Sequence, residues 1–430
     1  MAGARNDNGG GREEVCHYDI KILRDDVPQN DNRGVHSLRG EPYVYLIILK
    51  SNKKGMIIQM VYFDNAASTL IKPRCVARAV CEAINEYGAN PGRSGHKISL
   101  KAANIVYNTR CKLAAFFNAE PENVIFTNNA TTALNLAILG LDLKNAHVIT
   151  TDIEHNSVIR PLYSLEGVQI EHVCTDINDD IFISRLKAAI RPTTKLIVLT
   201  YASNVIGVKL PIEKIGALAN QNNIIFILDG VQGAGYDEID MQKMNIDFLC
   251  ITGHKGLYGP QGIGALIINT DTPLKPLVYG GTGTNSSDTA MPLLAPERYE
   301  SGTVNTPGIA GLGAGIDYIN TVGIKNINCK CSSLTQMTLE GLSVCKGINI
   351  YTPKNIAVAP IIAFNTQKSP SETGEYLDNA GICIRTGIHC APLVHKKIGQ
   401  PFGTVRISFS SFNTKNEVNF LLNIINNFNK

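Results

Sequence analysis

A chain of 430 residues with 44% hydrophobic and 18% charged side chains has the composition of a folded globular protein, long enough for two structural domains. Its formal charge of +3, from 40 basic and 37 acidic side chains, gives no sign of the basic surface that nucleic-acid binding requires, so we expect no nucleic-acid partner. The apolar stretch over residues 43–49 falls well short of the ~20 residues that span a bilayer, and the polar first residues do not resemble a secretory signal. We therefore expect a cytoplasmic protein without a membrane anchor.

The cysteines argue against a disulfide framework and against a zinc site. There are 11 of them, an odd number, and they are spread along a long chain without paired CxxC spacings. Cys329 and Cys331 form a CxC pair that could be half of a metal site, but the chain offers no second half. We therefore expect no bound metal and mostly reduced thiols within the core.

In chain order, the first 59 residues lack the periodic apolar pattern of a packed element. They have a Gly/Asn/Asp-rich opening and a scatter of charges, so residues 1–59 are expected to form a poorly ordered N-terminal extension. From residue 60 the pattern changes, and periodic apolar segments follow without long gaps. The folded body is expected to begin here, with residues 60–75 as an arm that leads into it.

Beyond the arm, short apolar runs alternate with segments of helical spacing. The expected strands are residues 123–127, 147–151, 195–201, 224–228 and 248–252. Helices are expected between them, for example over residues 99–117 and 212–221. Several of the strands are continuously apolar, as strands buried on both faces are, and their alternation with helices predicts an α/β fold with a mostly parallel, doubly wound sheet. This large domain is expected to span residues 60–315.

A second, smaller α/β domain is expected over residues 316–430. It follows a Gly-rich stretch over residues 308–315 and has a shorter, mixed pattern. An alternating strand over residues 404–409 and a helix from residue 416 are expected to complete it.

Polar side chains follow several of the expected strands, and ligands of open parallel sheets bind beyond the carboxyl ends of the strands. Thr131 and Thr132 follow the first strand and open a helix, so their backbone N–H groups and hydroxyls can bind a phosphate, although plain N-capping fits them as well. His155 follows the second strand, where it can stack on a flat ring, relay a proton or be merely structural.

Two further strand ends carry charges. Asp229 closes a wholly apolar strand, where a carboxylate is costly to bury unless it meets a cation or donors; capping of the next turn is the alternative. Lys255 stands in a polar, Gly-rich turn directly after the last expected strand, and by itself it could be a solvated turn residue. A phosphate-binding turn, a buried Asp and a Lys at the same edge of the sheet together supply the three contacts that pyridoxal phosphate needs.

This set of residues resembles the class V aminotransferases and, within them, the cysteine desulfurases, from residue 62 to about residue 420. The resemblance implies the fold type I architecture of pyridoxal-phosphate enzymes and a homodimer. It implies that Lys255 holds the cofactor covalently, that Asp229 lies on its pyridine nitrogen and that His155 stacks on its ring. The other cofactor contacts that it implies are Gln232 at the ring hydroxyl, Asn204 near the ring and the substrate, Ala130, Thr131, Thr132, Thr252 and His254 at the phosphate, and Thr282 and Thr303 across a dimer interface.

The segment from Arg385 to Pro392 is similar to the loop of group II cysteine desulfurases, whose Cys attacks the substrate sulfur. Cys390 lies there beside Arg385 and His389 in a Gly-containing loop, a setting that favours a reactive thiolate over an inert core thiol. Ile388 stands where many group II enzymes have a second His. This departure concerns the sulfur acceptor more than the chemistry.

The substrate carboxylate is expected to bind to Arg406, which lies in an apolar strand and matches the Arg that grips this group in the family. Asn204 and Arg385 are the other expected substrate-binding residues. A second departure, over residues 280–284, is a segment that differs from the hairpin of the sulfur-mobilisation enzymes.

The resemblance implies a cysteine desulfurase that converts L-cysteine to L-alanine, with Lys255, His155 and Cys390 as catalytic residues. Sulfur would collect on Cys390 as a persulfide, and a sulfur-acceptor protein is a possible partner. Other reactions on the same frame stay open, among them selenocysteine lyase, β-lyase and aminotransferase chemistry, in which Cys390 would be incidental. A non-catalytic scaffold for sulfur relay is a further alternative, which the joint presence of Lys255, Asp229 and Cys390 disfavours.

Overall fold

The computed structural model describes residues 19–21, 48–50, 57–92, 94–284 and 287–428. The chain divides into two compact units, Met1–Val61 and Tyr62–Lys430, and strand β4 (Val61–Tyr62) spans their boundary. In the first unit the described residues form a three-stranded antiparallel sheet. Its strands are β1 (Asp19–Lys21), β2 (Ile48–Lys50) and β3 (Ile57–Gln59). The expected poor order of residues 1–59 otherwise concerns residues outside the described ones.

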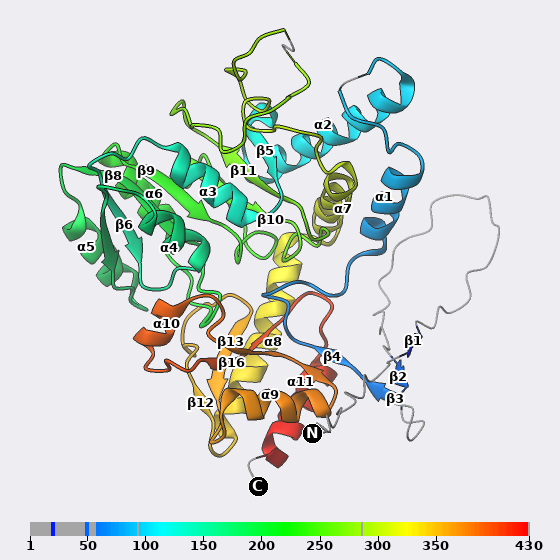
Figure 1. Ribbon diagram of the computed structural model, residues 1–430. Helices are drawn as coiled ribbons and strands as arrows, with labels where there is room; N and C mark the ends of the chain where they lie inside the picture. The colour runs from blue at the N-terminus through cyan, green and yellow to red at the C-terminus, as the bar shows by residue number, and fades with distance from the viewer. Residues whose placement is uncertain (1–18, 22–47, 51–56, 93, 285–286, 429–430) are drawn as a thin grey trace, which may run out of the picture. The chain divides into compact units, whose positions relative to one another are not determined.

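The second unit contains a seven-stranded sheet of order β5-β11-β10-β9-β8-β6-β7 (Figure 1). Its strands are β5 (Val124–Thr127), β6 (His147–Thr151), β7 (Gln169–Val173), β8 (Thr194–Thr200), β9 (Ile225–Asp229), β10 (Phe248–Thr252) and β11 (Gly264–Ile268). Neighbouring strands are parallel except at β11, which runs antiparallel to both β10 and β5. The expected α/β fold with a mostly parallel sheet is confirmed.

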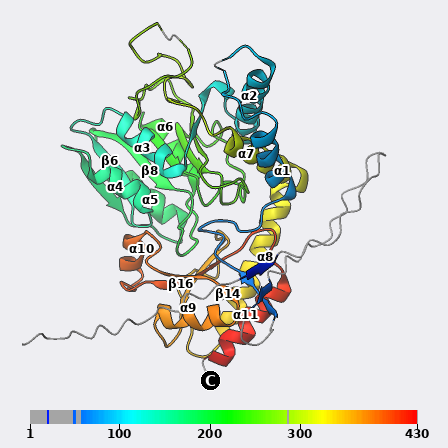
Figure 2. The same ribbon diagram turned by 45° about the vertical axis from the view of Figure 1, so that its right-hand side comes forward.

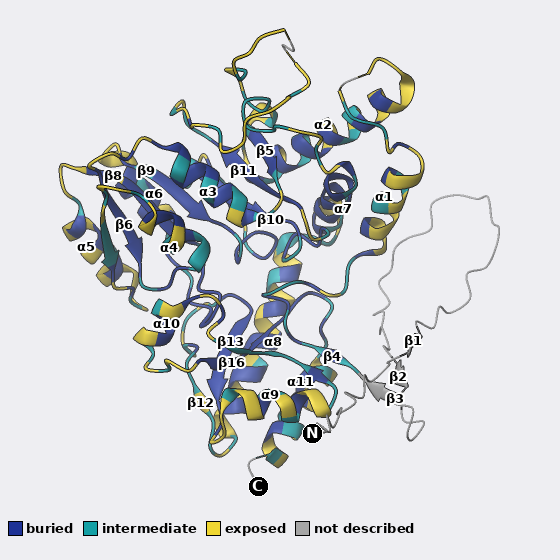
Figure 3. Cartoon of the chain, viewed as in Figure 1, coloured by how far each residue is buried: buried dark blue, intermediate teal, exposed yellow. Residues whose placement is uncertain are grey.

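Helices cover both faces of this sheet. They are α1 (Arg74–Asn85), α2 (Lys97–Phe117), α3 (Ala130–Gly140), α4 (Asn156–Tyr163), α5 (Asp179–Ala189), α6 (Ile212–Gln221) and α7 (Thr306–Val322), with a 3-10 turn η1 (Pro121–Asn123) before β5. Successive residues of β8 point to opposite faces: Leu196 and Val198 join a core with α3 and α4, whereas Ile197 joins a core with α2, α5, α6 and α7. Apart from β7 at the edge of the sheet, the strands are therefore buried on both sides (Figure 3), which explains their continuously apolar sequences.

A second, antiparallel sheet of order β12-β13-β16-β15 lies in the C-terminal part (Figure 2). Its strands are β12 (Asn349–Ile350), β13 (Ile361–Asn365), β15 (Arg385–Gly387) and β16 (Thr404–Ser408). The elements around it are α8 (Ile324–Val344), α9 (Pro370–Asn379), β14 (Ile382–Cys383), α10 (Pro392–Lys397) and α11 (Lys415–Phe428). Our expected domain boundary at residue 315 falls inside α7, which packs against α1 and α2, so the division at that residue stays a prediction.

The two sheets meet at the carboxyl ends of the parallel strands. The N–H of Ala359, before β13, donates to the carbonyl of Gly207, after β8, over 2.8 Å. The N–H of Asn156, at the start of α4, donates to the carbonyl of Cys390 over 2.8 Å. Within the described parts of the chain, no helix combines the length and the apolar character that crossing a membrane would require.

Candidate active site

Lys255 follows β10 in a turn whose next position, 256, has room for glycine alone. A Cβ on Gly256 would lie 2.3 Å from the carbonyl oxygen of Ala234, so the backbone on this side of the lysine approaches its neighbour too closely for a side chain. Burial of the amine lowers the pKa of Lys255 to about 8, helped by the positive charge of Arg406 and opposed by Asp229. A neutral amine, the nucleophilic form, is therefore accessible near neutral pH.

Asp229 is the last residue of β9, the parallel neighbour of β10, and its side chain is buried. Its Oδ1 accepts a hydrogen bond from the N–H of Val231 over 3.1 Å, which is the turn-capping contact expected as the alternative role. Burial raises the pKa of Asp229 to about 6, opposed by this hydrogen bond and by Lys255. A protonated ring nitrogen placed here would stabilise the carboxylate. Gln232, also buried, donates from Nε2 to the carbonyl of Ala66 over 3.4 Å.

His155 is the N-cap of α4. Its Nδ1 accepts from the N–H of Ser157 over 3.1 Å and lies 2.9 Å from Ser157 Oγ, which fixes the ring orientation. Burial lowers the pKa of His155 to about 4, with a further contribution from Lys255. The imidazole is therefore a neutral, flat surface at physiological pH, as stacking on an aromatic ring requires.

The expected phosphate site lies at the N-terminus of α3 and at the end of β10. Capping of α3 falls to Asn129, whose side chain accepts from the N–H of Thr132 over 3.0 Å, while the hydroxyl of Thr131 lies 2.8 Å from Ser157 Oγ. Ala130 is the first, buried residue of the helix. A helix N-terminus favours a phosphate through its N–H groups and its dipole.

Thr252 and His254 flank the same edge. His254 Nδ1 lies 2.9 Å from the hydroxyl of Thr252. Burial lowers the pKa of His254 to about 4, with further contributions from Lys255 and Lys72. A neutral His254 can donate one N–H to an anion without bringing a charge of its own.

The expected substrate side is built around Arg406, which is only 1% exposed. Its guanidinium donates to the carbonyl of Asn204 over 3.0 Å and to Asp64 Oδ1 over 2.7 Å. Arg385 lies directly opposite Arg406 in the β15–β16 pairing. Among the described residues, Asn204 Oδ1 and Arg406 Nε are buried without a hydrogen-bond partner. A hydrogen-bond acceptor and a hydrogen-bond donor that both lack a partner are suited to a polar ligand such as an α-amino acid.

The Cys390 loop is held against these residues. Asn204 Nδ2 donates to the carbonyl of His389 over 2.7 Å, next to the Asn156 contact with Cys390 described above. His389 and Cys390 both adopt left-handed backbone angles, with φ of 55° and 57°. Such angles cost non-Gly residues on the order of 1–3 kcal/mol each and persist where surrounding contacts enforce them. The side chain of Cys390 itself is exposed.

His389 lies beside Cys390 without a positive charge of its own. Its Nε2 lies 3.1 Å from the carbonyl of Thr404, and the ring is buried. Burial lowers the pKa of His389 to about 2, with a contribution from Arg406, so the ring is neutral. His389 therefore ties the loop to β16, and Arg385 is the cation that remains from the expected pair.

Thr282 and Thr303 lie apart from this cluster in the single chain. Thr303, exposed, accepts from Asn90 Nδ2 over 3.2 Å, and Thr282 donates to the carbonyl of Thr284 over 3.5 Å. Neither has a hydrogen bond to the other expected site residues within the described ranges. Their expected role across a dimer interface stays a prediction.

Three further residues contact the site but were not predicted from the sequence. They are Asp64, Thr69 and Lys72. Asp64 binds Arg406, and Thr69 and Lys72 donate to the carbonyls beside Lys255. Asp64 follows the short apolar run over residues 61–63, so the same rule of polar residues at strand ends could have found it.

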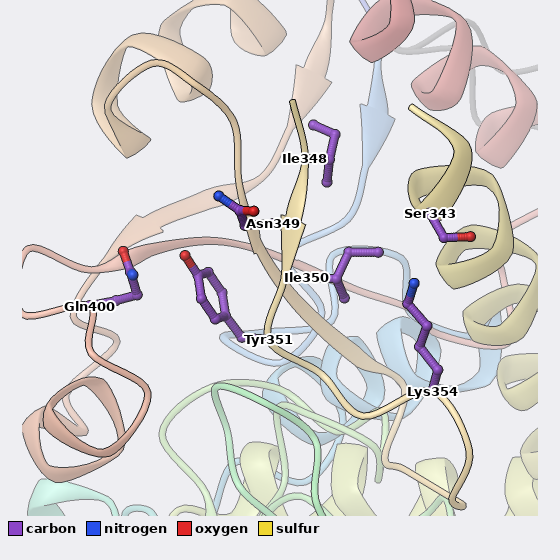
Figure 4. Close-up of a pocket in the computed structure, with 7 residues that line it drawn as sticks. All are labelled: Ser343, Ile348, Asn349, Ile350, Tyr351, Lys354 and Gln400. Carbon is purple, nitrogen blue, oxygen red and sulfur yellow. The ribbon is translucent and has the colours of Figure 1, made fainter. Parts of the chain in front are cut away.

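An open surface hollow lies elsewhere, against the edge strand β12 (Figure 4). It is lined by Ser343, Ile348, Asn349, Ile350, Tyr351, Lys354 and Gln400. Asn349 and Tyr351 extend to one side of the strand and Ile350 to the other, as strand alternation requires. The hollow shares no residue with the Lys255 cluster.

The Aminotransferase class-V family model matches residues 61–421. The chain belongs to this family. A probable cysteine desulfurase of Methanothermobacter thermautotrophicus is 36% identical over 373 residues, which are 84% of this chain and 92% of that protein. The expected family, including its similarity to cysteine desulfurases, is confirmed.

Solved structures agree with the family. The apo structure of a cysteine desulfurase from Thermococcus onnurineus NA1 has a TM-score of 0.81 and 34% sequence identity, and the match covers 86% of this chain and 94% of that chain. A C-DES variant with glycine covalently linked to its PLP cofactor has a TM-score of 0.74 at 21% identity, covering 85% of this chain and 96% of that chain. The latter similarity shows the fold alone.

Proposed function

We propose that this class-V aminotransferase family member is a pyridoxal-phosphate-dependent cysteine desulfurase, which converts L-cysteine to L-alanine and takes up the sulfur on Cys390. The observation that carries the proposal is that Asn204 and Asn156, which border the Lys255 edge, hydrogen-bond the backbone of His389 and Cys390. An exposed thiol is thereby fixed at an edge where a transaminase or β-lyase needs none. The similarity to proteins named cysteine desulfurase supports the same activity.

The residues of the edge fit pyridoxal phosphate. When bound, this cofactor joins amines through its aldehyde and draws electrons from the Cα of an attached amino acid. Asp229 would keep the proton on the ring nitrogen, because a buried carboxylate is stabilised by that positive charge. The neutral ring of His155 would cover one face, and Gln232 would bind the ring hydroxyl. The N-terminus of α3, Thr252 and His254 would hold the phosphate.

Lys255 is the residue that moves the proton. Its pKa of about 8 leaves the amine able to accept the Cα proton of the substrate and to return it later. Arg385 and Arg406 raise the positive potential around the amine, so their charges favour its neutral, basic form.

Arg406 and Asn204 would hold the substrate. A guanidinium suits a carboxylate through parallel N–H donors, and the buried Arg406 Nε and Asn204 Oδ1 have no other partner among the described residues. Asp64 keeps the guanidinium in place. Arg385, opposite Arg406 in the sheet, would add positive charge beside the guanidinium of Arg406.

Sulfur transfer needs no external oxidant or reductant. The C–S bond of L-cysteine breaks while an S–S bond to the sulfur of Cys390 forms. Sulfur is oxidised to the sulfane level, and the carbon is reduced to the methyl group of alanine. The thiol hydrogen of the substrate stays with the transferred sulfur. Cys390 loses its thiol proton, and the methyl carbon of alanine gains one hydrogen, so the hydrogens balance.

The partners are part of the proposal. A homodimer is supported by the exposure of Thr303 away from the cluster, because the family places this residue and Thr282 in the partner's site. A separate sulfur-acceptor protein is supported by the exposure of Cys390, whose loop borders an apolar hollow lined in part by Ile388 and Pro392. A cytoplasmic location stays part of the proposal.

The variant Cys390→Ser tests the proposal. A hydroxyl keeps the shape of the loop but is a far poorer nucleophile toward sulfur than a thiolate. Adding L-cysteine should still change the visible absorbance of the bound cofactor, whereas alanine release and the persulfide on the peptide containing position 390 should disappear. Alanine would be measured by chromatography and the persulfide by mass spectrometry.

Two control variants complete this test. Cys329→Ser replaces another exposed thiol and should behave like the parent. Lys255→Ala should lose both the visible absorbance and turnover. Release of alanine by Cys390→Ser at the parent rate would refute the desulfurase and favour a lyase or transaminase on the same fold.

A further inference from the structure

The segment of residues 64–72, here called the strap, holds the backbone on both sides of Lys255. The N–H of Thr69 donates to the carbonyl of His254 over 2.9 Å, and the hydroxyl of Thr69 donates to the carbonyl of Lys255 over 2.6 Å. Lys72 adds a third donor, its Nζ lying 3.0 Å from the carbonyl of His254. The peptide that precedes Lys255 and the peptide that follows it are therefore both fixed by one short stretch of chain.

The other end of the strap holds the expected substrate-binding arginine. Asp64 Oδ1 accepts from Arg406 over 2.7 Å, and the N–H of Ala66 donates to the hydroxyl of Ser408 over 2.8 Å. Asn65, which is buried, donates from Nδ2 to the carbonyl of Ser408 over 2.8 Å. The strap thus lies along the end of β16, with its first residue bound to the strand's only charged side chain.

The strap is short, and its anchoring residues are buried. Thr69 is 1% exposed and Asn65 is 2% exposed, so their hydrogen bonds are shielded from water. Only four residues lie between Asp64 and Thr69 in the sequence. A displacement at one end therefore cannot be absorbed by a long loop between the two anchors.

We infer that the strap is a positioning element, which sets the place of the Lys255 amine through Thr69 and the orientation of the Arg406 guanidinium through Asp64. The inference rests on the proposed function, in which Lys255 moves the Cα proton and Arg406 binds the substrate carboxylate. Neither Thr69 nor Asp64 contacts a reacting atom. Thr69 acts through Lys255, and Asp64 acts through Arg406. Substitutions at the two ends of the strap should therefore change different kinetic constants.

Thr69→Val tests the lysine end, because it removes one hydroxyl and keeps the branched shape. We expect kcat to fall roughly tenfold while KM changes less than about twofold, since proton transfer is sensitive to small displacements. The pH midpoint of the visible absorbance of the bound cofactor should shift by about half a unit. Thr321→Val is the matched control, because Thr321 also donates to a backbone carbonyl, that of Asp317, but at an exposed position of α7.

Asp64→Asn tests the arginine end. It keeps an oxygen acceptor and removes the charge that orients Arg406, so KM for L-cysteine should rise roughly tenfold while kcat stays within about twofold. The concentration of L-alanine that half-saturates the spectral change should rise in parallel. Asp317→Asn, which removes the acid of an exposed ion pair with Lys112, is the matched control.

Rescue separates positioning from simple packing. Thr69→Ser restores the hydroxyl and should recover the parent's spectral midpoint and most of kcat. A Thr69→Ser variant as impaired as Thr69→Val would overturn the inference, as would parent-like constants in both Thr69→Val and Asp64→Asn. The pH titration is recorded without substrate, so its result stands even if the parent enzyme released no alanine and the proposed function failed.

Discussion

Glu154 immediately precedes His155 and is completely buried. Its Oε1 accepts from the N–H of Thr200 over 3.1 Å and from the hydroxyl of Thr151, while Oε2 has no partner among the described residues. Burial raises the pKa of Glu154 to about 8 in spite of these two hydrogen bonds. The side chain is therefore a neutral acid at physiological pH that joins the ends of β6 and β8, where the loop carrying His155 begins.

The protonation of Glu154 should make stability depend on pH. The carboxyl titrates near 8 when folded and near its ordinary 4.5 when unfolded, so the folded chain binds more protons between these values. Stability contributed by this group is fully present below the ordinary pKa and is lost as the pH rises toward 8. Glu154→Gln mimics the neutral acid and should escape this loss.

The measurement compares melting temperatures of the cofactor-loaded proteins. Relative to the parent, Glu154→Gln should gain about 3–6 °C between pH of about 5.5 and about 8.5. Glu213→Gln, an exposed glutamate paired with Lys243, should show no such trend. An equal difference between Glu154→Gln and the parent at both pH values would contradict the prediction.

Single residues were predictable from sequence where their place at a strand end revealed them. Lys255, Asp229 and His155 each follow an apolar run, and the parallel sheet brings these ends together. Thr69 carries no such signal, because its partner carbonyl lies 186 residues away and becomes its neighbour only on folding. The neutral state of His389 likewise depends on burial, which adjacency to Cys390 does not reveal.

At the scale of elements, the turn that carries Lys255 packs against the loop after β9. A Cβ on Gly235, whose φ is 86°, would lie 2.1 Å from the carbonyl oxygen of Gly256. A Cβ on Gly256 would in turn lie 2.3 Å from the carbonyl oxygen of Ala234. Backbone meets backbone at both positions, so no side-chain movement can relieve an added methyl group.

Gly256→Ala should therefore shift the Lys255 turn. We expect a loss of about 1–3 kcal/mol in the free energy of unfolding, together with weaker binding of the cofactor. Chemical denaturation and cofactor titration by absorbance would measure the two effects. Gly95→Ala is the matched control, because nothing lies within 4 Å of its added Cβ. Equal stability of the two variants would show that the turn tolerates the displacement.

Some features of the fold were not apparent from the sequence, and each has a physical reason. β7 lies at the edge of the sheet and is mostly half-exposed, so its sequence lacks the continuous apolar run of the buried strands. The Gly-rich stretch over residues 308–315, after which we expect the second domain, lies within helix α7. An added Cβ on Gly313 would lie 2.6 Å from Thr109 Oγ1, and one on Gly315 would lie 2.2 Å from the carbonyl oxygen of Leu257. These glycines allow close helix packing, which composition alone does not distinguish from a linker.

At the scale of the whole molecule, the expected catalytic residues come from both sheets of the second unit. Lys255 and Asp229 belong to the parallel sheet, whereas Cys390 and Arg406 belong to the C-terminal sheet and its loops. The strap, which lies within the arm expected over residues 60–75, contacts both groups, through Thr69 on one side and Asp64 on the other. The arm is thus part of the site, although the sequence predicted it only as a lead into the fold.

Removal of residues 1–55 should leave this arrangement intact. Every residue assigned to the site lies at or after position 64, and the family match begins at residue 61. A chain that begins at Met56 keeps the whole arm and should have the parent's kcat/KM and a melting temperature within about 2 °C of the parent's.

A chain that begins at Arg74 lacks the strap and should lose most turnover, because the carbonyls beside Lys255 and the guanidinium of Arg406 lose their partners. Calorimetry and steady-state kinetics on both truncations would test this, and a large drop in melting temperature on removal of residues 1–55 alone would show that the first unit supports the fold.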